Sequence, residues 1–355
     1  MAMQNFIFYT KKSIEEYTNN RAYETKIGET LDVITNALSW KKDIENTAAD
    51  YILFGIPEDI GVIANNGKPG CNTLWQSFVS EFVNTQSNDF FDGTELLLLG
   101  YFNFDALKQL IEGNSINDYE KQIAYRHAVV TIDEQVSTLV KTIVQAGKMP
   151  IAIGGGHNNA YGMLRGSAKG LVKLDKINLP QINCINVDAH TDYRPLEGRH
   201  SGNGFRYAEE DGFLAKYCVL AIHENYLPQN VWLEIVNNPF VDFVSYEDLF
   251  INQKQTWQQA IQYAIQFTHE TYTGIELDVD AIANTESSAI SPTGITALQA
   301  RQYINTMAKQ QNIAYLHIAE GQHIHNQQTA KLVAYLVIDF VKQNLLAHEE
   351  TIHKV

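Results

Sequence analysis

The sequence is poor in cysteine, and its three cysteines, Cys71, Cys184 and Cys218, are widely spaced. An odd number of cysteines without a C-x-x-C pair excludes a disulfide framework and a zinc ribbon as the basis of the fold. Basic residues are also scarce, since 26 Lys and Arg stand against 41 Asp and Glu, for a formal net charge of -15. No basic patch would dominate such a field, so we expect no nucleic-acid partner and no anionic membrane surface as a partner.

Long apolar runs are missing as well. The first residues, MAMQNFIFYTKKSIEEY, lack the continuous apolar core of a signal peptide. No stretch of about 18 apolar residues resembles a membrane span. Together with the low cysteine content, these absences predict a soluble, cytoplasmic protein.

The sequence does contain a repeated alternation of short apolar runs and longer amphipathic stretches. This pattern is typical of β-α-β units that build a parallel sheet. Helical patterns at residues 127–147, 257–272 and 296–311 precede three of the strands, and connections of that length are crossovers. The eight predicted strands are residues 51–56, 96–99, 150–153, 181–187, 217–222, 240–244, 274–279 and 313–318.

Residues 1–50 are polar and irregularly patterned, with a short helix predicted at residues 40–50. We expect residues 1–50 to be an N-terminal extension packed on one α/β domain of residues 51–355, because no linker, repeat or low-complexity block divides the chain. In an open parallel sheet, the ligand site lies beyond the carboxyl ends of the strands. The residues that follow each strand are therefore the candidates for the site.

Four of these strand ends are rich in carboxylate and imidazole side chains. In an extended segment, residues two apart point to the same side, so the members of one motif can converge on a point shared with a neighbouring strand. The residues are His157 after the third strand, Asp188, His190 and Asp192 after the fourth, Asp278 and Asp280 after the seventh, and Glu320 after the eighth.

Such a gathering of carboxylates is unfavourable on its own. Four ionised carboxylates within a few ångströms repel one another by several kcal/mol at an effective dielectric of about 20. Two divalent cations would cancel their charge, and oxygen ligands with some imidazole suit Mn²⁺ or a similar ion better than structural zinc. Two metals that share a water lower its pKa towards neutrality, so the pattern predicts hydrolysis by a metal-activated hydroxide.

Each motif has other interpretations when it is taken alone. The D-x-H-x-D segment fits a strand-end turn with local hydrogen bonds from Asp side chains. Asp278 and Asp280 also fit a Walker-type acidic pair or a solvent-exposed turn. The glycine triplet before His157 fits a phosphate loop, but both G-x-G-x-x-G and G-K-[ST] are missing. The occurrence of all these motifs at strand ends favours the metal centre.

Taken together, the motifs resemble those of the arginase, agmatinase and formimidoylglutamase superfamily, and the resemblance extends from about residue 51 to residue 346. It implies a three-layer α/β/α sandwich with a central, mostly parallel eight-stranded sheet, and a homo-oligomer, either trimer or hexamer. It also implies two Mn²⁺ ions, other divalent metals being possible. The implied ligands are His157, Asp188, Asp192 and Asp278 for one ion and Asp188, His190, Asp278 and Asp280 for the other.

Several segments resemble the formimidoylglutamase branch in particular. The G-G-G-H run has Gly where arginases and agmatinases usually have Asp before the His. Residues 55–70 and the D-Y-R-P and S-G-N-G-F-R segments also resemble that branch. The resemblance implies hydrolysis of N-formimidoyl-L-glutamate to glutamate and formamide. The alternatives are an arginase or agmatinase that releases urea from a guanidino substrate, a metal-dependent deacetylase, and an inactive relative.

Arg194 carries a physical argument for this substrate. N-formimidoyl-glutamate has two carboxylates and one amidinium, so a strongly acidic protein must supply a local cation to hold it. Arginine and agmatine are net cations, which an arginine beside the metals would repel. The alternative is that Arg194 is a surface residue of a loop. Arg206 is a second candidate contact, although it can also begin a helix and pair with Glu209 or Glu210.

The remaining candidates have assigned roles by resemblance or by position. Glu320 is expected to hold the cationic nitrogens of the substrate, Asp192 to relay a proton, and His200 to act as a proton shuttle. The arginase histidine that follows the S-G-N segment is replaced by Phe205. A solvated loop histidine is the alternative for His200, and a structural role is the alternative for His223. The other expected substrate contacts are Ser201, Asn203 and His223.

Overall fold

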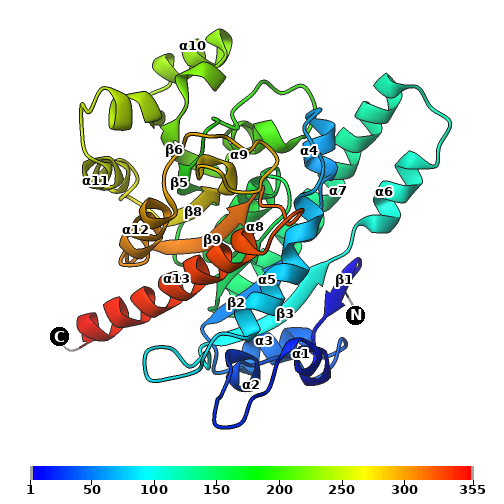
Figure 1. Ribbon diagram of the computed structural model, residues 1–355. Helices are drawn as coiled ribbons and strands as arrows, with labels where there is room; N and C mark the ends of the chain where they lie inside the picture. Colours follow the sequence, from blue (N-terminus) through cyan, green and yellow to red (C-terminus); the bar gives the residue numbers. More distant parts are fainter. Residues whose placement is uncertain (1–2, 353–355) are drawn as a thin grey trace.

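The apolar runs form one sheet of nine strands in residues 3–352, which the computed structural model describes (Figure 1). The strand order is β1-β3-β2-β4-β9-β8-β5-β6-β7, and every pair is parallel except β1 with β3. The strands are β1 Phe6–Phe8, β2 Tyr51–Gly55, β3 Leu96–Phe102, β4 Met149–Ile153, β5 Ile182–Val187, β6 Leu214–Ile222, β7 Val241–Ser245, β8 Thr273–Asp278 and β9 Ile313–Ala319.

The expected strand number of eight is corrected to nine by β1, which lies within the first 50 residues. Phe6 pairs with Phe102 and Phe8 pairs with Gly100 in an antiparallel edge. Gly100 has a φ of +135°, and a Cβ there would collide with the carbonyl oxygen of Ile7, so glycine is required where β1 approaches. A three-residue edge strand is too short to produce a periodic pattern, which is why the sequence did not reveal it.

Helices cover both faces of the sheet, so the predicted three-layer α/β/α arrangement is confirmed (Figure 1). The longer helices that pack on one face are α5 Leu74–Val83, α11 Trp257–Phe267, α12 Ala297–Met307 and α13 Gln328–Ile352, with α1 Lys11–Tyr17 and α2 Ile27–Thr30 at the edge. The helices on the other face are α3 Trp40–Asn46, α4 Ile60–Ala64, α6 Asp105–Glu112, α7 Asp118–Gln145, α8 Asn159–Lys173, α9 Gly204–Glu210 and α10 Gln229–Asn237.

Each strand contributes to both apolar layers because its side chains alternate between the two faces. In β2, for example, Leu53 packs in one core, while Ile52 and Phe54 pack in the other. Burial on both faces explains why the strands read as continuous apolar runs instead of alternating ones.

The four strands that carry the metal-binding motifs are neighbours in the centre of the sheet, in the order β4-β9-β8-β5. Because all four are parallel, their carboxyl ends meet at one edge. Short helical turns follow several strands there, at Ser201–Asn203, Glu224–Tyr226, Glu247–Ile251 and Val279–Ala281, and another lies at Cys71–Thr73. None of the helices in the described part of the chain has the length and apolarity that crossing a membrane requires.

Candidate metal centre

The glycine-rich turn after β4 brings His157 under the carboxyl ends of the central strands. Gly154 and Gly155 have φ values of +89° and +78°, in the region that favours glycine. A Cβ on Gly155 would lie 2.5 Å from the carbonyl oxygen of Ile56. The glycines therefore allow the tight turn, which leaves the His157 ring fully buried.

The ring of His157 faces three carboxylates at once. Its Nδ1 lies 3.2 Å from Asp188 Oδ2, 3.0 Å from Asp192 Oδ2 and 3.1 Å from Asp278 Oδ2. One ring nitrogen can donate a hydrogen to only one of them. Two ligands about 2.1 Å from a common ion and at right angles lie about 3.0 Å apart. The four side chains, which lie within 4.8 Å of one another, therefore fit the coordination shell of one ion.

A second group of ligands adjoins the first. His190 Nδ1 lies 3.1 Å from Asp280 Oδ2 and 3.5 Å from Asp188 Oδ1. Asp188 thus takes part in both groups. Asp278, which the resemblance implies is also shared, belongs to the first group by distance. Asp280 Oδ1 is buried without a hydrogen-bond donor among the described residues, as expected of a ligand atom whose partner is a cation.

Backbone and side-chain donors hold the carboxylates in place. The N–H of His190 donates to Asp188 Oδ1 at 2.6 Å, and the N–H of Asp280 donates to Asp278 Oδ1 at 2.8 Å. The Asn186 amide donates to Asp188 Oδ2 at 3.0 Å. The local turns that were an alternative to metal binding are therefore present, and they position the ligands.

The pKa directions of the cluster agree with a need for positive charge among these carboxylates. Burial lowers the ring pKa values of His157 and His190, but the surrounding carboxylates outweigh burial and raise both well above the usual value. Burial and the charge of Asp188 raise the pKa of Asp192 to about 7. Burial and the neighbouring Asp280 and Asp188 raise the pKa of Asp278. Protons therefore balance the carboxylates in the metal-free protein, and divalent ions would replace them.

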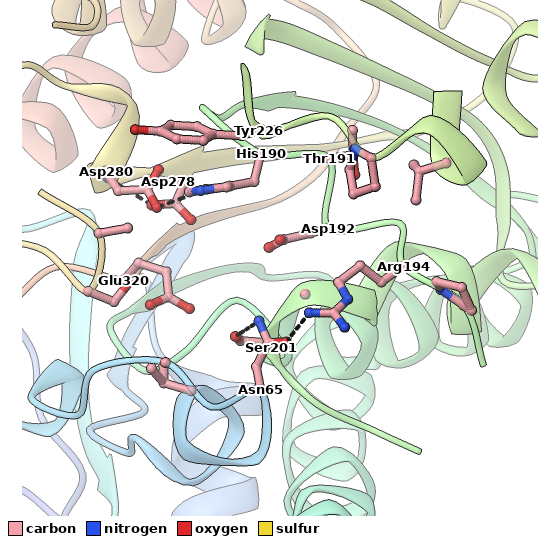
Figure 2. Close-up of a pocket in the computed structure, with 18 of the residues that line it drawn as sticks. Asn65, His190, Thr191, Asp192, Arg194, Ser201, Tyr226, Asp278, Asp280 and Glu320 are labelled. Atoms are coloured by element: carbon pink, nitrogen blue, oxygen red, sulfur yellow. Dashed lines mark hydrogen bonds and ion pairs between the residues drawn. The ribbon is translucent and has the colours of Figure 1, made fainter. Parts of the chain in front are cut away.

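A cavity of about 440 Å³ opens in front of the ligands (Figure 2). One end is formed by the acidic strand ends, and Arg194 lies across from them as the only Lys or Arg among the described lining residues. The lining residues with polar side chains are Asn65, His190, Thr191, Asp192, Arg194, Glu197, Ser201, Tyr226, Asn230, Asp278, Asp280, Ser288 and Glu320.

Glu320 lines the acidic end of the cavity. Its Oε1 accepts the backbone N–H of His157 at 2.7 Å, and the Cys71 thiol donates to its Oε2 at 3.3 Å. Burial raises the pKa of Glu320, although hydrogen bonds from Ser288 and His157 oppose the rise. Glu320 and Asp192 have φ values of +61° and +46°, a left-handed conformation that costs about 1–3 kcal/mol for a residue other than glycine.

Arg194 lies on the opposite wall, where its side chain is 45% exposed. It donates to Asn65 Oδ1 at 2.9 Å and to Glu197 Oε1 at 2.7 Å, so its guanidinium is held in place beside the cavity. Ser201 also lines this wall and accepts the Asn65 amide at 3.3 Å. The structure thus brings Arg194 and Ser201 to the same cavity as the metal ligands.

Asn203 does not line the cavity. Its buried side chain accepts from Arg199 Nη1 at 2.7 Å and donates to the carbonyl of Gly198 at 2.8 Å. Arg199 in turn forms a buried ion pair with Asp133, at 2.9 Å. These contacts give Asn203 a role in holding the loop that carries Arg194.

His200 lies behind this loop and is fully buried. Its Nδ1 accepts the N–H of Gly202 at 3.1 Å, and its Nε2 lies 3.2 Å from Glu197 Oε1. Burial and the charge of Arg194 lower the pKa of His200 to about 4. Both ring nitrogens are therefore engaged, and His200 is not among the residues that line the cavity.

Arg206 and His223 are also outside the cavity lining. Arg206 donates to the Tyr193 hydroxyl at 2.8 Å and pairs with Glu234 at 3.3 Å and Glu209 at 3.6 Å. The pairing with Glu209 is the alternative to a substrate contact that the sequence left open for Arg206. His223 is buried and stacks on Tyr246, with ring centroids 4.5 Å apart.

Sequence reasoning missed several residues of the cavity wall. Tyr226 stacks on His190, one of the candidate metal ligands, with ring centroids 5.0 Å apart. Asn65, Glu197 and Ser288 line the cavity from separate loops. None of them belongs to a motif with metal-ligand or catalytic spacing, so the sequence contained no signal for them.

Comparison with known proteins places the chain in a family. Residues 49–342 match the model of the Arginase family. The chain belongs to the arginase family. This membership confirms the expected resemblance, and the match includes all the residues of both ligand groups. Within the family, the chain is 25% identical over 304 residues to the formimidoylglutamase of Streptococcus pyogenes serotype M3, which covers 82% of this chain and 84% of that protein.

Solved structures agree with the arginase-family fold. Formimidoylglutamase from Bacillus subtilis is 14% identical with a TM-score of 0.70, over 92% of this chain and 94% of that one. Trypanosoma cruzi formiminoglutamase, determined with Mn²⁺, is 18% identical with a TM-score of 0.68, over 90% of this chain and 98% of that one. At these identities the likeness is one of fold.

Proposed function

We propose that the protein is a formimidoylglutamase, a hydrolase that converts N-formimidoyl-L-glutamate and water into glutamate and formamide with two Mn²⁺ ions as cofactor. The observation that carries the proposal is the cavity, in which Arg194 lies across from a cluster of metal-ligating carboxylates. The similar proteins of Streptococcus pyogenes and Bacillus subtilis bear the same name, and the Trypanosoma cruzi structure contains Mn²⁺.

The donor set fits two hard or borderline divalent ions, since it combines carboxylate oxygens with two imidazoles and contains no thiolate. Two such ions, when bound, polarise a water molecule and lower its pKa towards neutrality. The proposed ligands are His157, Asp188, Asp192 and Asp278 for one ion and Asp188, His190, Asp278 and Asp280 for the other.

The protein's own groups would bind the amidine and move the proton. Glu320, at the acidic end of the cavity, pairs with the cationic nitrogens and so presents the amidine carbon to the attacking water. Asp192, which lines the cavity beside His157, accepts a proton from the water and delivers it to the departing amine nitrogen. The carbon–nitrogen bond then breaks, and formamide and glutamate leave.

Arg194 would select the substrate by charge. A guanidinium forms paired hydrogen bonds with a carboxylate, and the glutamate portion of the substrate offers two carboxylates. Asn65 and Glu197 hold the Arg194 side chain, and Ser201 adds a hydroxyl to the same wall. A guanidino substrate with a net positive charge would meet this arginine unfavourably.

A guanidino substrate is the second candidate, and one observation favours it. Five carboxylates line the cavity, which suits a cationic ligand: Asp192, Glu197, Asp278, Asp280 and Glu320. Hydrolysis of arginine or agmatine would release urea instead of formamide.

A substrate panel separates the two candidates. The purified protein is loaded with Mn²⁺ and given N-formimidoyl-glutamate, arginine, agmatine, guanidinobutyrate or guanidine, and formamide and urea are both measured. We expect formamide from N-formimidoyl-glutamate, with kcat/KM about 10–100-fold above that of the guanidino substrates, since a lost charged hydrogen-bond pair costs about 1.5–3 kcal/mol. Urea from arginine or agmatine as the main product would contradict the proposal.

We also propose a cytoplasmic homo-oligomer, a trimer or hexamer of the 40.1 kDa chain, on the basis of the family resemblance. Light scattering after gel filtration measures the mass, and a monomer would contradict this proposal. Residues 1–50 are proposed to be an extension packed on the family domain, which is supported by the start of the family match at residue 49 and by the pairing of β1 with β3. Cell fractionation tests the location.

A further inference from the structure

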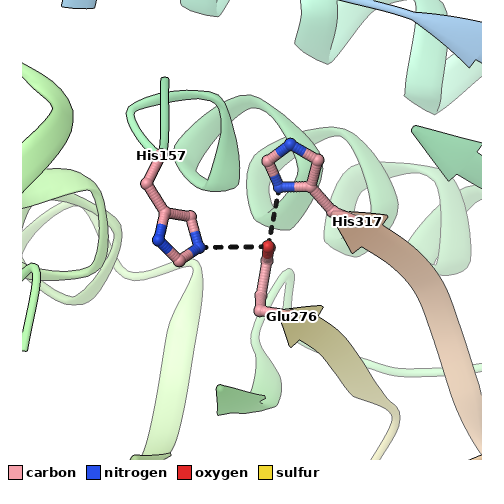
Figure 3. Close-up of side chains that lie close together, drawn as sticks. All are labelled: His157, Glu276 and His317. Atoms are coloured by element: carbon pink, nitrogen blue, oxygen red, sulfur yellow. Dashed lines mark hydrogen bonds and ion pairs between the residues drawn. The ribbon is translucent and has the colours of Figure 1, made fainter. Parts of the chain in front are cut away.

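A second polar cluster lies behind the metal ligands, inside the sheet (Figure 3). Glu276 is in β8, two residues before Asp278, and its partner in the β8–β9 register is His317. Glu276, His317 and His157 are all fully buried. An ionisable cluster in this position must be neutralised internally, because no water reaches it.

Glu276 is the centre of the cluster. Its Oε2 lies 2.6 Å from His317 Nδ1 and 3.4 Å from His157 Nε2, and its Oε1 accepts the Tyr315 hydroxyl at 2.8 Å. Both oxygens of the carboxylate therefore face donors. The contacts come from β9 and from the turn after β4, and they fix the orientation of the Glu276 side chain.

His317 lies directly against Glu276. Its Nδ1 faces the carboxylate, and its Nε2 lies 3.4 Å from the carbonyl oxygen of Gly154. Both ring nitrogens thus face acceptors within the protein, which leaves neither of them directed at an ion. His317 is therefore not available as a metal ligand, and the trio does not form a third metal site.

The two nitrogens of His157 have opposite surroundings. Nδ1 faces the carboxylates of Asp188, Asp192 and Asp278, so it must keep its lone pair in order to bind an ion. The ring proton then belongs on Nε2, which is buried and makes no hydrogen bond in the described part of the chain. An unpaired buried N–H is costly, and Glu276 Oε2 is the acceptor that faces it (Figure 3).

We propose that Glu276 is a positioning residue that fixes the tautomer and ring orientation of His157, with His317 holding Glu276 Oε2 in place. The inference rests on the metal centre of the proposed function, but not on the identity of the substrate. A carboxylate behind a metal-bound imidazole makes the imidazole a better ligand, and the loss of such a partner typically weakens metal binding by about 10–100-fold. Only one of the two ligand groups contains His157, so we expect the larger effect at that ion.

The test compares Mn²⁺ binding by the full-length Glu276→Gln and wild-type proteins, using calorimetric titration and electron paramagnetic resonance. We expect one of the two Mn²⁺ ions to bind about 10–100-fold more weakly in the variant. The other ion, held through His190, changes by less than about threefold, so the coupled two-ion spectrum gives way to a single-ion spectrum. Tyr315→Phe is the matched control, because it removes a hydrogen bond from Oε1 and leaves Oε2 facing His157.

A measurement on the wild-type protein tests the proposal even if the Glu276→Gln variant does not fold. Nitrogen-15 spectra of the histidines in Zn²⁺-loaded wild-type protein should show the His157 proton on Nε2, and a proton on Nδ1 would overturn the proposal. Equal weakening of both ions, no weakening, or an equal effect of Tyr315→Phe would also overturn it. A wild-type protein that binds no Mn²⁺ would refute the proposed metal centre itself, so the two failures are distinguishable.

Discussion

The two ends of the cavity are built in different ways. At the acidic end, the side chains come from the carboxyl ends of the central strands β4, β5, β8 and β9, most of them are buried, and backbone N–H groups hold Asp188, Asp278 and Glu320. At the opposite end, Arg194, Asn65 and Ser201 come from loops, and Arg194 is 45% exposed. Under the proposed function, the sheet would fix the groups that break the bond, while the choice of substrate would depend on loops that the sheet does not constrain.

The largest expected loss of activity comes from the Asp278→Asn substitution, which alters the acidic end of the cavity. Asparagine can still accept the N–H of Asp280, but it lacks the charge that attracts an ion. We expect kcat/KM to fall on the order of 1000-fold or more, because metal charge stabilisation is worth several kcal/mol.

The same variant should not be less stable than the wild type when both are metal-free, since it removes a charge from a repulsive cluster. Thermal unfolding in the presence of a chelator measures this. A large loss of stability without metal would indicate that Asp278 is structural.

The Arg194→Ala substitution removes the guanidinium from the loop end of the cavity and leaves the acidic end unchanged. The loss of a charged contact to a substrate carboxylate costs about 1.5–3 kcal/mol, so we expect kcat/KM for N-formimidoyl-glutamate to fall about 10–100-fold, mainly through KM. Mn²⁺ affinity should stay within about threefold. The matched control is Arg206→Ala, because Arg206 pairs with Glu209 and Glu234 away from the cavity. Equal losses in both variants would contradict the assignment of Arg194.

The pH dependence of Mn²⁺ binding tests the acidic end of the cavity separately from the loop end, because only the acidic end exchanges protons for cations. The ring pKa values of His157 and His190 are raised by the carboxylates, so bound protons stabilise the metal-free fold at low pH and are lost as the pH rises. Mn²⁺ must displace these protons. Its affinity should therefore rise with pH, by about tenfold per pH unit for each proton released.

Calorimetric titrations at pH 6, 7 and 8 in buffers of different ionisation enthalpy measure both the affinity and the protons released. The difference in Tm between Mn²⁺-loaded and chelated protein should widen in the same direction. A Mn²⁺ affinity that is independent of pH would contradict the picture of a cluster balanced by protons.

The smallest effect is expected for His200→Asn. The Asn Oδ1 can replace the ring Nδ1 as acceptor of the Gly202 N–H, so the loop should keep its shape. The pKa of His200 is lowered to about 4, so it is neutral across the working range. We expect less than about a fivefold change in kcat and the same pH–rate profile between pH 6 and 9. The disappearance of one limb of that profile would instead support the proton-shuttle role.

The acidic end was predictable because its signals are local. Asp188, His190 and Asp192 are two residues apart in extended chain, and parallel strands end at the same edge of the sheet. The sheet itself was predictable for the same reason, except for β1, whose three residues give no periodic signal.

The loop end was less predictable because it depends on contacts between distant residues. Arg194 is held by Asn65, which is 129 residues away, and Asn203 is held by Arg199, whose partner Asp133 is 66 residues away. Sequence periodicity contains no information on such contacts.

The role of Glu276 was only partly predictable from the sequence. It is two residues before Asp278 and on the same side of a buried strand, so its charge requires a partner. The identity of that partner, however, is set by the β8–β9 register, which the sequence does not show.

The central claim is that the carboxylates at the carboxyl ends of the central strands hold a pair of cations. It is tested most directly by elemental analysis of the protein after reconstitution with Mn²⁺ and removal of excess ion, alongside hydrolysis of N-formimidoyl-glutamate. The account predicts two Mn²⁺ ions per chain, and loss of both metal and activity on chelation. A protein that binds no Mn²⁺, or that keeps full activity after all metal is removed, would contradict it.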